Sequence, residues 1–77
     1  MRELVEFLAR ELVDDPDGVE VTESLDDRGP RFTLSVAPDD MGKVIGRGGR
    51  TAKAIRSVVR AAATRQGTSA YVDIVDR

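Results

Sequence analysis

The 77-residue sequence contains no cysteine, no histidine and no tryptophan, and its aromatic residues are one tyrosine and two phenylalanines. A chain without cysteine and histidine has no disulfide framework, no zinc site of the usual kind, no thiol nucleophile and no imidazole base. It also has no apolar run near the roughly 20 residues of a membrane span, and no apolar core of a signal peptide. These absences exclude most small-enzyme chemistries, and they predict a cytoplasmic protein with no membrane partner, no cofactor and no metal.

The charges are divided unevenly between the two halves of the chain. Residues 1–40 carry four arginines against twelve acids, a balance of −8, whereas residues 41–77 carry eight lysines and arginines against two acids, a balance of +6. No acidic residue lies between Met41 and Val72. Such asymmetry is typical of a protein with a surface that meets an anion, most often nucleic acid or membrane phosphate, and the net charge of −2 conceals it.

Apolar spacing predicts three helices and three strands. In the first segment, leucines and valines recur at helical spacing until Pro16 and Gly18 stop the helix. Alternating apolar residues indicate the strands, and the turn sequence DDRGP joins the first two as a hairpin. The predicted elements are a helix over 2–14, strands over 19–24 and 31–36, helices over 38–45 and 50–66, and a strand over 69–75.

The ends and faces of the second and third helices follow from single residues. Pro38 suits the first helical position, while Asp39 and Asp40 suit a first turn whose N–H groups are unpaired. Gly67 is expected to end the third helix in a left-handed conformation. The third helix is predicted to have an apolar stripe of Ala52, Ile55, Val59, Ala62 and Ala63, with Val58 near its edge, and a neighbouring basic face of Lys53, Arg56 and Arg60.

The element order α-β-β-α-α-β predicts an α+β fold in which helices pack on one face of three strands. A chain this short forms one domain, residues 1–77, and buries only about 60–65% of its unfolded surface. The core is therefore expected to be small.

A glycine-rich turn, Gly46-Arg47-Gly48-Gly49, joins the second and third predicted helices. Glycine adopts positive φ angles, and without a Cβ atom it lets another molecule approach the main chain closely. The next helix begins at once, so its N–H groups and positive dipole end face the same place. Together with the cations of Arg47, Arg50 and Lys53, this turn predicts a docking edge for a phosphodiester backbone.

Two simpler interpretations of this region are possible. A glycine-rich turn between helices is commonly just a tight corner, and a run of charge is commonly a solvated helix face. Three glycines exceed the needs of a corner, however, and a solvated face would commonly mix charges of both signs to gain i,i+4 pairs. The absence of acids on the third helix therefore favours an anion-binding surface.

Other phosphate-binding and metal-binding motifs fail on spacing. A P-loop requires glycine where Val44 stands and lysine where Arg50 stands. A dinucleotide-binding fingerprint requires glycine or alanine at Thr51, and it follows a strand rather than a helix. A calcium loop around DDPDG would place Val13 at the first ligand position and Ser24 where the bidentate glutamate belongs.

Three pairs of aspartates leave a metal-dependent nuclease as the enzyme alternative. Each pair, at 14–15, 26–27 and 39–40, lies at a predicted turn or helix start, where aspartate is favoured for local reasons. The sequence therefore favours a binding protein over an enzyme.

The sequence VIGRGGRTAKAIR resembles the signature of a KH domain, Ile-Gly-x-x-Gly followed by a helix, and the element order resembles the type II arrangement. With VAPDDMGK before this signature and VDIV near the end, nearly all 77 residues resemble the KhpA family of small bacterial KH-domain RNA-binding proteins. The resemblance implies one type II KH-like domain with a three-stranded mixed sheet.

The same resemblance implies a function and a site. In KH domains the Gly-x-x-Gly loop clamps the backbone of about four single-stranded nucleotides, whose bases lie along an apolar groove. Family members resemble RNA chaperones or post-transcriptional regulators, form homodimers, and pair with a larger KH-domain companion, KhpB (also called Jag or EloR), in cell elongation, cell shape and cell wall biogenesis. The RNA-binding residues predicted here are Lys43, Ile45, Gly46, Arg47, Gly48, Gly49, Arg50 and Lys53, with Val44 placed either in the groove wall or in the core.

A rival hypothesis is a protein-interaction adaptor that dimerises through the KH fold and binds RNA only incidentally. In that case the third helix would bury Val58 or the alanines at 61–63 against a partner. The acid-rich first half could then meet a basic surface.

Overall fold

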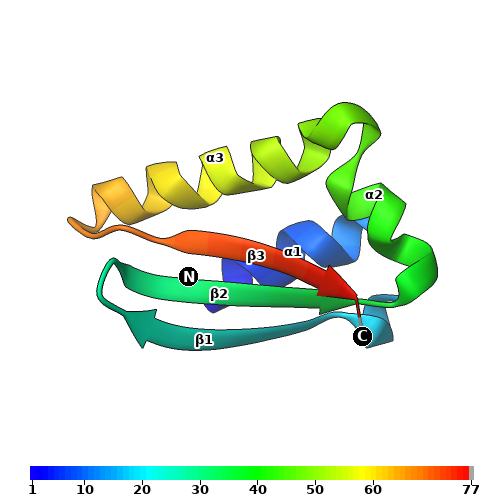
Figure 1. The fold of residues 1–77 in the computed structure, drawn as a ribbon, viewed down its shortest axis with the longest axis horizontal. Helices are drawn as coiled ribbons and strands as arrows, with labels where there is room; N and C mark the ends of the chain where they lie inside the picture. Colours follow the sequence, from blue (N-terminus) through cyan, green and yellow to red (C-terminus); the bar gives the residue numbers. More distant parts are fainter. Residues whose placement is uncertain (77) are drawn as a thin grey trace.

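The computed structural model describes residues 1–76, which form three helices and one three-stranded sheet (Figure 1). The order is α-β-β-α-α-β, with short 3-10 turns between the elements, and it confirms the predicted α+β fold. The elements are α1 (Arg2–Leu12), η1 (Pro16–Gly18), β1 (Glu20–Asp26), β2 (Gly29–Val36), η2 (Pro38–Asp40), α2 (Met41–Ile45), η3 (Arg47–Gly49), α3 (Arg50–Arg65) and β3 (Tyr71–Asp76).

The sheet has the order β1-β2-β3 and is mixed, as predicted. The hairpin pairs β1 with β2 antiparallel, and β2 pairs with β3 parallel, with Arg31 opposite Tyr71 and Phe32 opposite Val72. A parallel pair needs a crossover connection. The segment containing α2, the glycine turn and α3 supplies it, so the turn lies within the crossover, between its two helices, and β3 is an edge strand (Figure 1).

The core lies between one face of the sheet and the three helices. Strand residues alternate, so Phe32, Leu34 and Val36 are buried while their neighbours face away from the core. Figure 1 shows α1 behind the sheet and α3 running along β3. The buried hydrophobic cluster consists of Val5, Ala9, Val19, Val21, Phe32, Leu34, Val36, Val44, Ile55, Val59, Ala63, Ala70 and Val72.

Helix α3 ends as the sequence predicted. Gly67 has a φ angle of +74°, its N–H donates to the carbonyl of Thr64, and the N–H of Thr68 donates to the carbonyl of Ala63. This is the Schellman arrangement, which satisfies carbonyl groups that the helix leaves unpaired. It turns the chain back into β3, beside the last turns of α3.

Asp40 has a different role from the one expected for it. The sequence assigned its carboxylate to the first turn of the second helix, but neither η2 nor α2 has a side-chain cap. Instead the carboxylate is only 3% exposed and accepts hydrogen bonds from the N–H groups of Asp14 and Asp15, at 3.2 and 3.1 Å. Asp40 therefore ties the segment after α1 to the start of α2, a contact that local sequence does not reveal.

Candidate nucleic-acid interface

Helix α2 carries the glycine turn on a short, well-anchored support. Its Val44 side chain is fully buried in the core, whereas Ile45 is 36% exposed beside the turn. The sequence left open whether these two residues belong to the core or to a groove. Val44 is a core residue, and Ile45 is the apolar side chain that α2 presents next to Gly46.

The first glycine of the turn is required by its close packing against α3. Gly46 has a φ angle of +77°, and a Cβ atom on it would lie 2.7 Å from Cβ and 2.8 Å from the backbone nitrogen of Thr51, and would also overlap Oγ1 of that residue. Gly46 and Thr51 therefore pack at nearly the closest distance that two residues can reach. A residue with a side chain at this position would push the two helices apart.

The other two glycines meet open space. Gly48 and Gly49 have φ angles of +65° and +79°, and a Cβ atom on either would find no other atom within 4 Å. The turn is closed by its own hydrogen bonds, because the N–H of Gly49 donates to the carbonyl of Gly46 and the N–H of Arg50 donates to that of Arg47. Within residues 1–76, the N–H groups of Arg47 and Gly48 have no acceptor.

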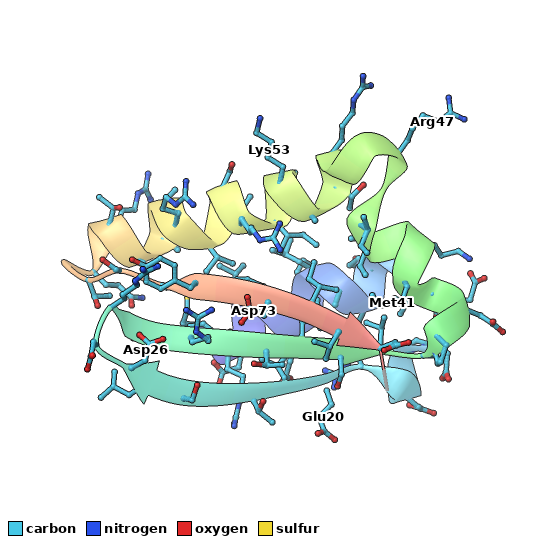
Figure 2. All side chains as sticks on the ribbon, in the orientation of Figure 1. Glu20, Asp26, Met41, Arg47, Lys53 and Asp73 are labelled. Atoms are coloured by element: carbon cyan, nitrogen blue, oxygen red, sulfur yellow. The ribbon has the colours of Figure 1, made fainter. Side chains whose placement is uncertain are left out.

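Three cations surround these unpaired amides. Arg47, Arg50 and Lys53 are exposed, and none of their side chains makes a hydrogen bond or ion pair with a described residue. Figure 2 shows Arg47 projecting from the turn and Lys53 from α3, both away from the sheet. Glu20 projects from β1 on the opposite side of the molecule. The fold therefore places the cations Arg47 and Lys53 on the side of the molecule opposite Glu20, an acid of the first half.

Lys43 is the predicted site residue that the structure does not bring to this cluster. Its Nζ atom lies 2.9 Å from Oδ2 of Asp14 and 3.8 Å from Oδ1 of Asp40. The hydrogen bond to Asp14, followed by the charges of the nearby aspartates, raises the pKa of Lys43. Its charge is thus matched by acids from the first half of the chain, unlike the charge of Lys53.

The predicted basic face of α3 divides into two parts. Lys53 points away from the sheet, but Arg56 turns toward it, and its Nε donates a hydrogen bond of 3.1 Å to the carbonyl of Val72 on β3. Arg60, one turn further on, borders a hollow between α3 and β3. The spacing of the sequence placed these residues on one face but could not show which of them bonds to the edge strand.

The acidic pairs at 14–15 and 39–40 meet through the backbone hydrogen bonds to Asp40 and through Lys43. No group of three or more aspartates, glutamates, cysteines or histidines that could hold a metal ion occurs within residues 1–76. Among the same residues, no helix has the length and apolar character needed to cross a membrane.

The KH-domain profile described as "KhpA/KhpB, KH domain" matches residues 2–74. The chain belongs to the KhpA/KhpB KH-domain family. Similar relatives are the RNA-binding protein KhpA of Halalkalibacterium halodurans, which is 58% identical over 76 residues covering 99% of this chain and 100% of the relative, and that of Clostridium perfringens, which is 51% identical over 97% of this chain and 100% of the relative. The RNA-binding protein KhpA of Streptomyces coelicolor is 46% identical over 99% of this chain and 92% of its own length.

Solved structures confirm the KH-type fold of this family member. Era in complex with MgGDPNP and nucleotides of 16S ribosomal RNA superimposes with a TM-score of 0.67 over 97% of this chain, at 17% sequence identity. Aquifex aeolicus Era bound to GDP and AlF4⁻ gives a TM-score of 0.66, also at 17% identity. The match covers 29% of each Era chain, and at this identity it concerns the fold alone.

Proposed function

We propose that this KhpA/KhpB family member binds single-stranded RNA, with low sequence specificity, at the turn formed by Gly46, Arg47, Gly48 and Gly49. The observation that carries the proposal is the pair of amides at Arg47 and Gly48 that have no acceptor within residues 1–76, next to open space and three cations that are unpaired among the same residues. Relatives of this chain are named RNA-binding proteins, and this supports the proposal.

The chemistry of this site is recognition of a sugar-phosphate backbone. The N–H groups of Arg47 and Gly48 donate to phosphate oxygens, and the open space above Gly48 and Gly49 lets the strand approach the main chain. Arg50 and Lys53 add charge attraction from the first turn of α3, and exposed Ile45 offers an apolar contact to a base. Lys43 stays a predicted contact that first has to leave its ion pair with Asp14.

The proposal includes a finer biological role, which the resemblance to the family supports. In this proposal residues 1–77 act as a single cytoplasmic KH domain with no enzymatic activity. It works as an RNA chaperone or post-transcriptional regulator, as a homodimer or with a larger KH-domain partner of the KhpB type, in cell elongation, cell shape and cell wall biogenesis. A site with so few contacts binds weakly by itself. A second copy or a companion protein raises the avidity for RNA without adding contacts to either site.

Replacing Arg47 and Gly48 together by aspartate tests the proposal directly. Both positions are exposed, so the circular dichroism spectrum stays close to wild type and the melting temperature falls only by the cost of the left-handed conformation at position 48, while carboxylates at the phosphate position abolish binding of an oligouridylate. Arg65→Asp, at the far end of α3, is the control for a change of charge alone. Full binding by the loop variant, or amide NMR signals at residues 46–49 that stay fixed during titration, would move the site elsewhere.

The exposed side of α3 supports the adaptor as a second candidate function. Val58 is 45% exposed on this helix. Of the alanines at 61–63, Ala63 is fully buried and only Ala61 is exposed, so Val58 is the main apolar contact available there. Partner capture that survives ribonuclease and the loop substitution, but is lost in Val58→Asp, favours the adaptor.

A further inference from the structure

The strand β1 forms the second edge of the sheet, on the side away from β3 and α3 (Figure 1). All of its residues except Val21 are exposed, and Leu25 is 80% exposed. The other edge is partly occupied, because Arg56 of α3 donates to the carbonyl of Val72 on β3. An edge strand with unpaired backbone groups is a template for another extended chain, and β1 is the more open of the two edges.

The hairpin register shows which backbone groups of β1 point outward. Asp26 and Gly29 pair directly across a loop of two residues, so they form the hydrogen-bonded pair that closes the turn. Bonded and non-bonded pairs alternate along an antiparallel ladder. The N–H and carbonyl groups of Val21, Glu23 and Leu25 therefore point away from β2, and no other residue of the described chain bonds to them.

Carboxylates are the main protection of this edge. Natural edge strands are often blocked by lysine, by proline or by a bulge. The strand β1 has no lysine or proline, and its register with β2 runs over seven consecutive pairs without a bulge. Glu20 and Glu23 make no ion pair within residues 1–76, so unmatched negative charge lies beside the outward backbone groups.

The charge of this edge selects a basic partner rather than a second copy. If two β1 strands paired antiparallel about Glu23, that residue would face its own copy and Glu20 would face Asp26. Like charges directly opposite each other destabilise a pair of strands, whereas opposite charges stabilise it. The three acids recur at every third residue, so a partner strand with a cation at every third residue matches all of them.

We propose that the β1 edge binds an extended, lysine-rich segment of another protein, which adds a fourth strand to the sheet. The backbone of the segment pairs with residues 21, 23 and 25, its cations face Glu20 and Glu23, and an apolar side chain covers Leu25. Strand addition takes its affinity from main-chain hydrogen bonds and its specificity from the side chains. This surface is separate from the glycine turn and does not depend on the proposed RNA binding.

A heptapeptide of sequence KVTKVTK, blocked at both ends, tests the site. Paired antiparallel with β1, it places its three lysines opposite the three acids. In an amide NMR titration of the whole chain, we expect the N–H groups of Val21, Glu23 and Leu25 to shift and to become protected from hydrogen exchange, while those of residues 46–49 stay in place. The same peptide, N-methylated at its second, fourth and sixth residues, keeps the charge but lacks the N–H groups that face β1, and it is expected not to bind.

Substitutions in the protein separate backbone pairing from charge. Leu25→Pro removes one outward N–H, leaves the bonds to β2 in place and is expected to weaken peptide binding about fivefold. Leu25→Thr, its control, keeps that N–H and is expected to change the affinity less than twofold. Glu23→Lys is expected to weaken binding about fivefold, whereas Asp39→Lys, at an exposed acid outside β1, leaves it unchanged.

Three results would overturn the docking edge. Equal binding of the N-methylated peptide, or equal losses in Glu23→Lys and Asp39→Lys, would show attraction to net charge alone. Protection of the β1 amides that grows with protein concentration in the absence of peptide would identify a second copy as the occupant. The Arg47 and Gly48 double variant is expected to bind the heptapeptide as the wild type does, so failure of the RNA site and failure of the β1 edge are observed separately.

Discussion

Gly46 and Gly48 both have positive φ angles, but their surroundings differ. A Cβ atom on Gly46 would overlap Thr51, whereas one on Gly48 would meet open space. The positive φ angle by itself disfavours any residue with a side chain, by about 1–2 kcal/mol. The two positions therefore separate the cost of backbone conformation from the cost of close packing.

Alanine at each position makes this difference measurable. We expect Gly48→Ala to lower the free energy of unfolding by about 1–2 kcal/mol, the cost of the left-handed conformation. Gly46→Ala is expected to lower it by about 3 kcal/mol or more, because strain from the displaced Thr51 adds to that cost. Urea denaturation of both variants gives the values, and equal losses would show that the contact with Thr51 yields easily.

The two lysines show how single residues of the same type acquire different roles. Lys43 is bonded to Asp14, and Lys53 is unpaired within residues 1–76. Both lie on the basic half of the chain, near the glycine turn in sequence. Only Lys53 has a charge that is available to a phosphate without breaking an existing contact.

At the scale of elements, the β1–β2 hairpin is held by the carboxylate of Asp26. The backbone N–H of Arg28 donates to it at 2.8 Å and Nε of Arg31 donates at 3.0 Å, and these hydrogen bonds lower the pKa of Asp26. Because the pKa in the folded state lies below the unfolded value of about 3.9, the ionised carboxylate stabilises the fold above that value. This stabilisation is lost as the pH falls through the folded pKa.

The hairpin therefore contributes to acid sensitivity. We expect the free energy of unfolding of the wild type to fall more steeply below about pH 4 than that of Asp26→Asn, which has no carboxylate to protonate there. Urea denaturation at neutral pH and at successive acidic pH values measures both. Asp27→Asn is the matched control, since Asp27 makes no hydrogen bond within the described residues and its removal leaves the steep dependence in place. Identical curves for the two variants would contradict a stabilising role for Asp26.

The crossover from β2 to β3 shows how elements place the candidate site. Asp40 fixes the start of α2 against the segment after α1, and buried Val44 fixes its middle. Gly46 then sets the contact with α3, whose Arg56 bonds to the carbonyl of Val72 on β3. The turn is thus held by tertiary contacts on both sides, while its own amides at Arg47 and Gly48 have no partner in the described part of the chain.

At the scale of the whole molecule, charge segregation predicts a strong dependence of RNA affinity on salt. For single-stranded RNA, each phosphate that a protein neutralises contributes about −0.7 to the slope of log K, the logarithm of the binding constant, against log salt. About three phosphates therefore give a slope near −2. Lys53→Gln is expected to reduce that slope by about 0.7, and Arg65→Gln to leave it unchanged. Binding measured over a series of salt concentrations gives these slopes, and an affinity independent of salt would rule out backbone recognition.

Much of the fold and part of the site could be predicted from the sequence. Apolar spacing located the helices and strands to within about two residues, except that residues 38–40 form the 3-10 turn η2 rather than the start of α2. The glycines of the turn were recognised because a positive φ angle is a local property of the chain. The roles of Asp40, Arg56 and Lys43 were not recognised, because their partners Asp14, Asp15 and Val72 lie far away in sequence.

The sequence alone determined the order of the elements, the glycine turn and the uneven division of charge, because each can be read along the chain, and its resemblance to the KH signature indicated the KH-type fold. Only the tertiary structure decided which charges are matched and which are not. An ion pair depends on distance in space, and folding brings Asp14 to Lys43 and Asp73 to Arg31, while it leaves Arg47, Arg50, Lys53 and Arg60 unpaired among residues 1–76. In the proposed function these unmatched cations, rather than the total positive charge of the second half, define where an RNA strand binds.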